Sequence, residues 1–309
     1  MYMKNEDIIQ MLDSWLVVNS IIGCTNGCKY CFLQATSDNI ARPKIKVDAS
    51  KAIEMLYSSK YYDSNIPICL LPNTDPFLNQ VNIDYTKEML DKLNNDKISN
   101  PIILITKCLI PESFCDYLQD LKESGMTIVI YLSLSGLGTK YEPNIKHDNI
   151  RLNFQNLALR GIQTIHYYRP FIPDNSNAKD IEKMLDFVNS YTNISVVTGL
   201  KTKPDFIDKM NIWTVTAEKT EECLNSLEVW PQSSYEYFFR DYKHPQNIFQ
   251  TNACALRQAL KIPNPAFYGT AECMNGNICS KEQRKRCTGC KKVDIENLLN
   301  KLKELLIKS

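Results

Sequence analysis

Short apolar runs alternate with helical patterns along the first 200 residues of the chain. Each run is nearly continuous in apolar or β-branched residues, which is typical of parallel strands covered on both faces. The predicted strands span residues 15–22, 66–71, 101–106, 127–133, 163–168 and 194–199. Between them, apolar residues recur three and four positions apart, and the predicted helices span residues 49–58, 83–93, 111–123, 148–160 and 177–190.

Two of these helices have clear start signals. Asp48 can cap the first helix, because its carboxylate can accept from a free backbone N–H, and Pro111 suits a first helical position. Six strand–helix alternations predict an α/β fold with a parallel sheet. A closed barrel of eight units typically needs about 250 residues. We therefore expect a partial (β/α)6 TIM-type barrel whose open side is covered by the rest of the chain.

The pattern changes near residue 214. Residues 230–239 are aromatic and irregular, a cysteine-rich stretch follows, and residues 295–307 predict a closing amphipathic helix with lysines on its polar side. We therefore expect two parts, a partial-barrel core in residues 1–214 and a small irregular cysteine-rich domain in residues 215–309.

Charge and hydropathy limit the partners and the cellular location that we expect for this chain. The chain has 309 residues and a net charge of +1, with 36 basic and 35 acidic side chains, so a pervasive surface for polyanions is not expected. No apolar run reaches the roughly 18 residues that a membrane span needs. The first residues lack the order of a secretion signal, so we expect a cytoplasmic protein with no membrane partner.

Cysteine is the unusual residue, with 12 copies. In a cytosolic chain with enough residues for a core, thiolate ligation of soft metals is a better explanation than disulfides. One group comprises Cys24, Cys28 and Cys31, and a second comprises Cys254, Cys273, Cys279, Cys287 and Cys290. The other four, Cys69, Cys108, Cys115 and Cys223, lie in apolar or helical patterns and are predicted to be small buried side chains.

The first group has the spacing C-x3-C-x2-C, directly after the first predicted strand, with Tyr30 just before the last cysteine. Three thiolates so close together can hold one corner of an iron–sulfur cubane and leave its fourth iron without a protein ligand. A zinc knuckle with a fourth ligand elsewhere is the alternative, although no partner C-x2-C pair lies nearby.

On this motif, residues 15–200 resemble the radical S-adenosylmethionine (SAM) superfamily. The resemblance implies a 4Fe–4S cluster whose open iron is chelated by the amino and carboxylate groups of SAM. One electron, from a donor such as flavodoxin or ferredoxin, then cleaves SAM to methionine and a 5′-deoxyadenosyl radical. That radical abstracts hydrogen from a substrate, which the sequence does not identify as a small molecule, a peptide or a nucleic acid.

Further stretches resemble the spore photoproduct lyase branch of this superfamily. In that branch an acidic residue after the second strand suits the SAM amine, and a lysine after the third strand and a serine after the fourth contact SAM. The residues that the resemblance implies for SAM binding are Tyr30, Thr74, Asp75, Lys107, Ser133 and Ser135. Glu142-Pro143 with Arg151, and the run Arg169-Pro-Phe-Ile-Pro173, are similar to the same branch.

One departure limits what the resemblance implies. The photoproduct lyases carry a hydrogen-donating cysteine just before the Thr/Ser-Asp pair, where this chain has Pro72 and Asn73. Cys69 lies farther back, inside the predicted strand. The resemblance therefore extends to the fold and to SAM chemistry but not to photoproduct repair.

The second cysteine group falls within a turn-rich tail. Four of its five thiols could enclose an auxiliary iron–sulfur cluster, which we favour, or a structural zinc ion, and free cysteines are the remaining reading. The basic run 281–292, from Lys281 to Lys292, is read as a solvated flank of the metal loop or as a nucleic-acid contact. A zinc-stapled nucleic-acid- or protein-binding module without catalysis is the alternative function.

The remaining candidates are the three histidines and the residues that end the fifth predicted strand. His147, His166 and His244 lack metal-ligand spacing and are predicted to be ordinary polar or core residues. Tyr167, Tyr168 and Arg169, at the end of the fifth predicted strand, are expected to face the substrate cavity.

Overall fold

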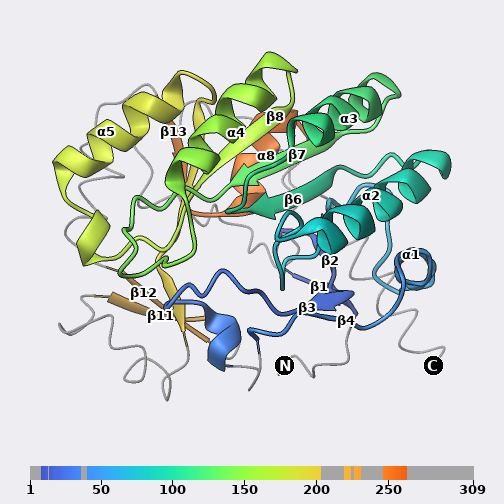
Figure 1. The fold of residues 1–309 in the computed structure, drawn as a ribbon, viewed down its shortest axis with the longest axis horizontal. Helices are drawn as coiled ribbons and strands as arrows, with labels where there is room; N and C mark the ends of the chain where they lie inside the picture. The colour runs from blue at the N-terminus through green and yellow to red at the C-terminus, as the bar shows by residue number, and fades with distance from the viewer. Residues whose placement is uncertain are drawn as a thin grey trace.

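The computed structural model describes residues 8–12, 14–35, 40–202, 219–223, 226–230 and 246–262. An eight-stranded sheet forms its centre, with the strand order β1-β2-β5-β6-β7-β8-β9-β13. These strands are β1 (Ile9–Met11), β2 (Leu16–Val18), β5 (Ile68–Leu70), β6 (Ile102–Thr106), β7 (Ile128–Leu132), β8 (Gln163–Tyr168), β9 (Ile194–Val197) and β13 (Asn247–Phe249). The helices are α1 (Ala49–Tyr57), α2 (Gln80–Asn95), α3 (Glu112–Glu123), α4 (His147–Leu159), α5 (Ala178–Asn189) and α8 (Asn252–Leu260), and Figure 1 shows their arrangement.

Parallel pairing runs without a break from β2 to β13, and only β1 is antiparallel to its neighbour. The predicted partial (β/α)6 barrel is therefore confirmed, with β13 added as a further parallel strand beside β9. The predicted first strand was too long. It ends at Val18, and β3 (Ile21–Ile22) instead pairs with β4 (Lys44–Ile45) in a separate two-stranded sheet. The break falls at Asn19 and Ser20, two buried polar residues within the predicted strand, and apolar residues resume directly after them.

The helix starts follow the expected capping chemistry. The Asp48 carboxylate accepts from the backbone N–H of Lys51 and begins α1. Pro111 is the N-cap of α3, one residue before the first helical position that was predicted for it.

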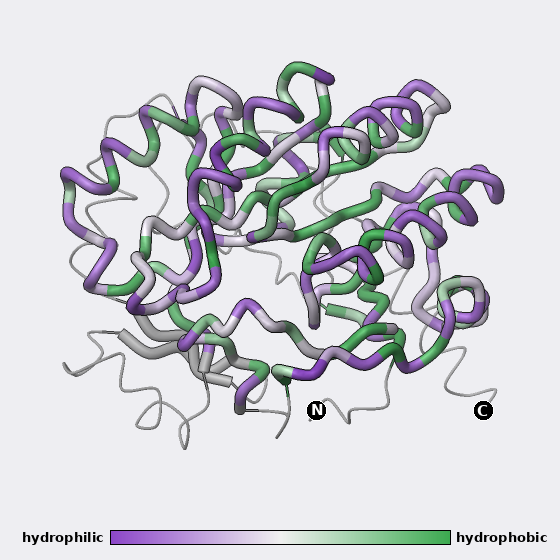
Figure 2. The backbone as a smooth tube through the Cα atoms, in the orientation of Figure 1, coloured by the Kyte–Doolittle hydropathy of each residue, from purple (hydrophilic) through white to green (hydrophobic). Residues whose placement is uncertain are grey.

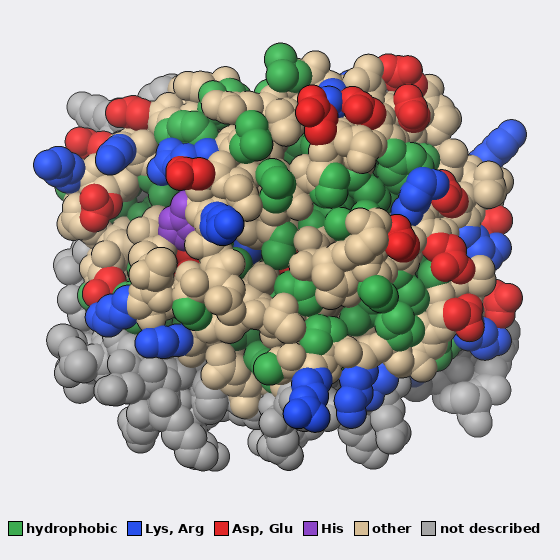
Figure 3. Space-filling view, in the orientation of Figure 1, with side chains coloured by type: hydrophobic (Ala, Val, Ile, Leu, Met, Phe, Trp, Pro, Cys, Tyr) green, Lys and Arg blue, Asp and Glu red, His purple; other side chains and the backbone are tan. Residues whose placement is uncertain are grey.

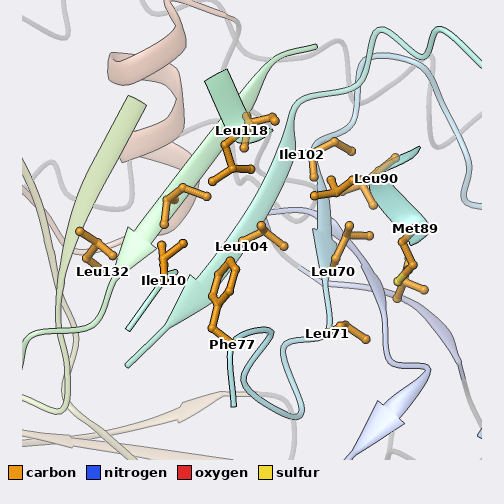
Figure 4. Packing of buried hydrophobic residues seen from close by; sticks show 14 of the residues in the cluster. Leu70, Leu71, Phe77, Met89, Leu90, Ile102, Leu104, Ile110, Leu118 and Leu132 are labelled. Atoms are coloured by element: carbon orange, nitrogen blue, oxygen red, sulfur yellow. The ribbon is translucent and has the colours of Figure 1, made fainter. Parts of the chain in front are cut away.

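Helices α1 to α4 cover the outer face of the sheet with a large apolar cluster. Figure 4 shows this packing, in which Leu70, Ile102 and Leu104 of the strands face Met89 and Leu90 of α2. In Figure 2 the strands are mostly hydrophobic along their length, whereas the helices alternate between hydrophobic and hydrophilic residues. This difference is expected when a parallel sheet is covered on both faces and its helices on one.

A second apolar cluster fills the inner face of the sheet. Trp15, Cys69, Tyr131 and Tyr167 belong to it, together with Ala255 and Leu256 of α8. The α8 helix lies against the inside of the partial barrel, behind β7 and β8 in Figure 1. Residues of the predicted C-terminal extension therefore contribute one strand and one inner helix to the barrel, while the boundary near residue 214 itself lies outside the described residues.

A three-stranded antiparallel sheet lies at the edge of the barrel. It consists of β10 (Leu200–Thr202), β12 (Ser226–Trp230) and β11 (Lys219–Cys223), in that order. Within the described part of the chain, no helix is both long enough and apolar enough to cross a membrane.

Candidate functional site

The three clustered cysteines lie on the loop that follows β3, at the carboxyl ends of the parallel strands. Gly23 enters this loop with a φ of +109°, and a Cβ there would lie 2.7 Å from the carbonyl oxygen of Ile40. Glycine is therefore required directly before Cys24 for both conformational and steric reasons. The backbone N–H of Cys24 then donates to that carbonyl oxygen at 2.6 Å.

Neighbouring strand ends hold this cysteine loop on two sides. The N–H of Gly23 donates to the carbonyl of Asn73, in the loop after β5. On the other side, the N–H of Lys29 donates to the carbonyl of Tyr141, in the loop between β7 and α4. The loop is therefore placed where ligands of parallel α/β folds bind.

The thiols of Cys24, Cys28 and Cys31 are close enough to interact electrostatically with one another. Burial is the main cause of their raised pKa values, and it raises the pKa of Cys28 to about 11. Thiolates buried at this place would therefore need a positive charge beside them, which an iron–sulfur cluster would supply. Three soft sulfur donors on one loop fit such a cluster and leave one iron open.

The described residues contain no group of three or more His, Cys, Asp or Glu side chains that could hold a single metal ion. A cubane binds each thiolate through a different iron, so its ligands need not converge on one point.

Asp75 lies in the loop between β5 and α2 and is 4% exposed. Its carboxylate accepts from the hydroxyl of Thr106 at 2.7 Å and from the backbone N–H groups of Lys107 at 2.8 Å and Phe77 at 3.0 Å. Burial raises the pKa of Asp75, and these neutral donors oppose the shift. No described cationic side chain forms an ion pair with this carboxylate, so its charge is not neutralised within the described part of the chain.

The backbone before Asp75 is unusual. Leu71 directly follows β5 and has a φ of +57°, a left-handed conformation that is rare for a branched apolar residue. Its side chain is nevertheless fully buried in the outer core. Such backbone strain persists only where the surrounding structure imposes it, and it is common at functional sites. Thr74 follows in the same turn, and its hydroxyl accepts from the side-chain amide of Asn82 at 3.2 Å.

Glu142 lies at the centre of the site, although no role was predicted for it from the sequence. Its carboxylate is completely buried and is contacted from four elements. One oxygen accepts from the Lys107 ammonium at 2.7 Å and from the hydroxyl of Tyr30 in the cysteine loop. The other oxygen accepts from the hydroxyl of Ser135 at 2.8 Å and lies 2.5 Å from Nε2 of His147, the first residue of α4.

This environment determines the charge of Glu142. Burial alone would raise its pKa, but the Lys107 ammonium and the hydrogen bonds from His147 and Tyr30 outweigh that effect and lower the pKa to about 2. Glu142 is therefore ionised at neutral pH. The Lys107 ammonium also donates to the carbonyl of Ser133 at 3.1 Å, so the structure brings Tyr30, Lys107, Ser133 and Ser135 together around Glu142.

The residues at the end of β8 divide between the two faces of the sheet. Tyr167 lies in the inner cluster, where its hydroxyl accepts from Arg169 at 2.8 Å. The prediction that Tyr168 faces the cavity was wrong. Its ring packs with Phe171 and with Ile181 of α5, because neighbouring strand residues point to opposite faces. Arg151 lies 4.5 Å from the centre of the Phe187 ring, where it is part of the helix packing.

The described cysteines outside the two groups have two kinds of environment. Cys69 and Cys115 are fully buried in the apolar clusters, as predicted. Cys108 is different, since its half-buried sulfur lies 3.5 Å from the side-chain amide nitrogen of Asn26, in the cysteine loop. The sequence signal that could have placed it at the site is its position directly after Lys107.

The second cysteine group is described only in part. Cys254 lies in the first turn of α8, where it is partly buried against the inner apolar cluster, and its N–H donates to the capping hydroxyl of Thr251. The remaining members, Cys273, Cys279, Cys287 and Cys290, lie outside the described residues, as do His244, the basic run 281–292 and the predicted helix 295–307. Cys223 belongs to β11, but its side chain is not described.

His166 is a core histidine, as predicted. Its Nε2 faces the carbonyl oxygen of Leu134 at 2.9 Å and must carry the proton, so Nδ1 accepts from the hydroxyl of Ser195, also at 2.9 Å. Burial lowers the pKa of His166 to about 4. It is therefore neutral under ordinary conditions. It ties β8 to β9 on the outer face of the sheet, where its ring packs against Phe154 of α4.

Comparison with solved structures identifies the fold. A spore photoproduct lyase complexed with dinucleoside spore photoproduct superposes with a TM-score of 0.56 at 11% identity, covering 76% of this chain and 74% of that one. A double mutant of spore photoproduct lyase with bound AdoMet (SAM) and the same photoproduct gives a TM-score of 0.55 at 12% identity, covering 72% and 70%. A radical SAM methyltransferase from Sphaerobacter thermophilus superposes less well, with a TM-score of 0.43 at 13% identity over 66% of this chain and 64% of its own.

No protein-family model matches the sequence, and no curated protein matches it either. The chain shares its fold with spore photoproduct lyase, as the sequence resemblance predicted.

Proposed function

We propose that this chain is a radical SAM enzyme whose cluster is held by Cys24, Cys28 and Cys31. The observation that carries the proposal is the placement of these three thiols on one loop, beside Asp75 and the Lys107–Glu142 pair at the carboxyl ends of neighbouring strands. When bound, a 4Fe–4S cluster and SAM supply one-electron cleavage of SAM to methionine and a 5′-deoxyadenosyl radical.

The chain's own residues bind and orient SAM in this proposal. Asp75 receives the SAM ammonium, because its buried carboxylate has no cationic partner among the described residues and an ammonium would complete its charge. Lys107 faces the SAM carboxylate while Glu142 holds the lysine in place. Tyr30, Thr74, Ser133 and Ser135 lie around these two groups and position them.

The substrate stays open between a small molecule, a peptide and a nucleic acid. The photoproduct lyase structures contain a dinucleoside photoproduct, and this chain shares their fold at low identity. Pro72 and Asn73 stand where the lyases have their hydrogen-donating cysteine, so we propose a substrate other than spore photoproduct.

The test is anaerobic reconstitution with iron and sulfide, followed by SAM and dithionite, with 5′-deoxyadenosine measured by chromatography. Single Cys24→Ala, Cys28→Ala and Cys31→Ala variants should form no 5′-deoxyadenosine. Cys115→Ala is the matched control, since that thiol lies on the buried face of α3, in the outer core, and should be dispensable for the reaction. If the three loop variants are as active as the control, the assignment is wrong, and a colourless zinc-containing protein would instead favour the binding module.

We further propose a second metal centre, most simply an iron–sulfur cluster, in the C-terminal tail. Cys254 packs against the inner core from the first turn of α8, so we assign Cys273, Cys279, Cys287 and Cys290 as the four ligands. A Cys24/Cys28/Cys31→Ala variant should then retain about four irons, as expected for one intact cubane. A folded triple variant with neither iron nor zinc would remove the second centre, and loss of metal in Cys254→Ala would show that the four ligands are misassigned.

A further inference from the structure

An exposed basic segment lies beside the cysteine loop. We call it the β4 strip, and it consists of Arg42, Lys44, Ile45 and Lys46, most of which are exposed. Residues 40–47 contain no acidic side chain. Figure 3 shows Lys and Arg side chains gathered at the lower edge of the molecule, below the position of β3 and β4 in Figure 1, with no Asp or Glu among them.

The β4 strip is attached directly to the proposed cluster loop. Lys44 is paired with Ile22, two residues before Cys24, and the Cys24 N–H donates to the carbonyl of Ile40. The backbone of Pro43 packs against Gly23, where a Cβ would lie 3.0 Å from the Cα of Pro43. The strip therefore forms the outer wall of the start of this loop.

The basic side chains of the β4 strip differ from the lysines on the helices in their ion pairing. Lysines on α1 and α2 form ion pairs within their own helix, as in Lys51–Glu54 and Lys87–Asp91. No described residue forms an ion pair with Arg42, Lys44 or Lys46. Lysines on an edge strand also discourage strand pairing between molecules. That role does not account for Ile45, which is 49% exposed between the two lysines.

An apolar side chain flanked by positive charges that no described residue neutralises is suited to an acidic protein partner. The apolar group is buried on contact, and the surrounding charges steer the approach and set its dependence on salt. A partner bound here would lie against the loop that carries Cys24, Cys28 and Cys31.

We propose that the β4 strip is the docking surface for an acidic one-electron carrier protein of the flavodoxin type. This inference rests on the proposed function, since the carrier would reduce the cluster held by the adjacent loop. One electron leaves the reduced flavin of the carrier and is accepted by the oxidised cluster, and no atom is transferred.

The test compares two charge-reversal variants of the full-length reconstituted protein. Lys44→Glu/Lys46→Glu changes the strip, and Lys179→Glu/Lys183→Glu makes the same change in net charge on exposed positions of α5, on the opposite side of the molecule in Figure 1. Binding of an FMN-containing flavodoxin is measured by calorimetry at low and high salt. Cluster reduction is followed by electron paramagnetic resonance with reduced flavodoxin and, separately, with dithionite.

The strip variant should bind flavodoxin at least about ten-fold more weakly at low salt and lose most of the salt dependence. It should be reduced more slowly by flavodoxin but normally by dithionite, whereas the α5 variant should match the wild type. Equal behaviour of the two variants, whether both normal or both weakened, would overturn the proposal. The same variants are titrated with a short single-stranded DNA. If the strip variant loses DNA binding but binds flavodoxin as the wild type does, the strip is a nucleic-acid contact and the proposal is overturned. If dithionite produces no cluster signal in the wild type, the proposed function fails, while the calorimetric comparison still decides the docking surface.

Discussion

Asp75 and Glu142 are two buried carboxylates at neighbouring strand ends, and their electrostatic environments are opposite. Asp75 is held by the Thr106 hydroxyl, the Cys108 thiol and two backbone N–H groups, all of them neutral. Glu142 is held by the Lys107 ammonium, His147 and two hydroxyl groups. Burial raises the pKa of Asp75, whereas the cationic partner lowers that of Glu142 to about 2.

The comparison distinguishes a carboxylate suited to binding a ligand from one suited to holding the structure together. Burying a charge costs several kcal/mol unless it is paired, and Glu142 has its counter-charge within the protein. Asp75 has none among the described residues, so its environment improves when a cation enters the site. A buried carboxylate with only neutral donors is therefore the better candidate for recognising a ligand's ammonium group, and the one with a lysine partner is the better candidate for holding the loops together.

The largest expected effect is the loss of Glu142. Glu142→Ala leaves the Lys107 ammonium without its counter-charge in a largely buried position, which should lower the free energy of unfolding by about 3–5 kcal/mol. The measurement is denaturant unfolding of the purified protein. Glu112→Ala is the control, because its exposed carboxylate shares Arg160 with Asp116, and it should cost no more than about 1 kcal/mol. Similar losses in both variants would refute the anchoring role of Glu142.

The second prediction concerns His166, which is buried and forms no ion pair with a described residue. Its pKa is about 4 in the folded protein and near its ordinary value of 6.5 in the unfolded chain, so unfolding binds a proton below pH 6.5. The contribution of His166 is complete above pH 6.5 and should fall as the pH drops from 6.5 to 4. At about 1.4 kcal/mol for each pKa unit, the loss should reach a few kcal/mol.

Denaturant unfolding between about pH 7 and pH 4.5 tests this expectation. His166→Gln can keep both hydrogen bonds, through its amide N–H and its carbonyl oxygen, but cannot take up a proton. Its stability should therefore fall less steeply with decreasing pH than that of the wild type. Parallel curves would show that burial does not keep His166 neutral.

A smaller effect is expected at Asp75, and it should appear in ligand binding. In the reconstituted protein, Asp75→Ala should weaken SAM binding roughly ten- to a hundred-fold, as expected for loss of one charge-assisted hydrogen bond. Asp75→Asn should weaken it less, because the amide oxygen still accepts. Equilibrium dialysis with labelled SAM measures both, and Asp116→Asn, a surface carboxylate paired with Arg160, should bind like the wild type. Unchanged affinity in Asp75→Ala would remove Asp75 from the SAM site.

Much of this site was predictable from sequence because its residues lie at strand ends. Cys24, Asp75 and Lys107 each follow an apolar run, and parallel strands bring such positions to one edge. The four-element contact of Glu142 was not predictable, since it depends on the path of the loop between β7 and α4. A loop's path is set by tertiary contacts that leave no periodic signal.

The fold likewise has parts that could be predicted from the sequence and parts that could not. The parallel strands from residue 16 to residue 197 have apolar runs long enough to be recognised. β13 has only three residues, Asn247–Phe249, and follows an irregular region, so its addition to the sheet leaves little trace in the sequence. The inward position of Tyr167 and the outward position of Tyr168 follow from strand alternation once the start of β8 is known.

The smallest predicted effect compares single neutral hydrogen bonds to the two carboxylates. Ser135→Ala removes one hydroxyl from Glu142, which keeps the Lys107 ammonium. Thr106→Val removes one hydroxyl from Asp75, which keeps its backbone donors and the Cys108 thiol, all of them neutral. Each change should cost about 0.5–1.5 kcal/mol in the free energy of unfolding, and Thr106→Val should cost more because Asp75 has no described cation to share the remaining charge. Thr106→Val should also raise the pKa of Asp75 further, so its deficit should grow as the pH rises through the range in which Asp75 ionises, because a carboxylate lacking a donor is harder to ionise. Ser135→Ala should show no such growth, because Lys107 keeps Glu142 ionised across that range. If the two variants lose stability equally at every pH, the electrostatic difference between the two carboxylates is smaller than their surroundings indicate.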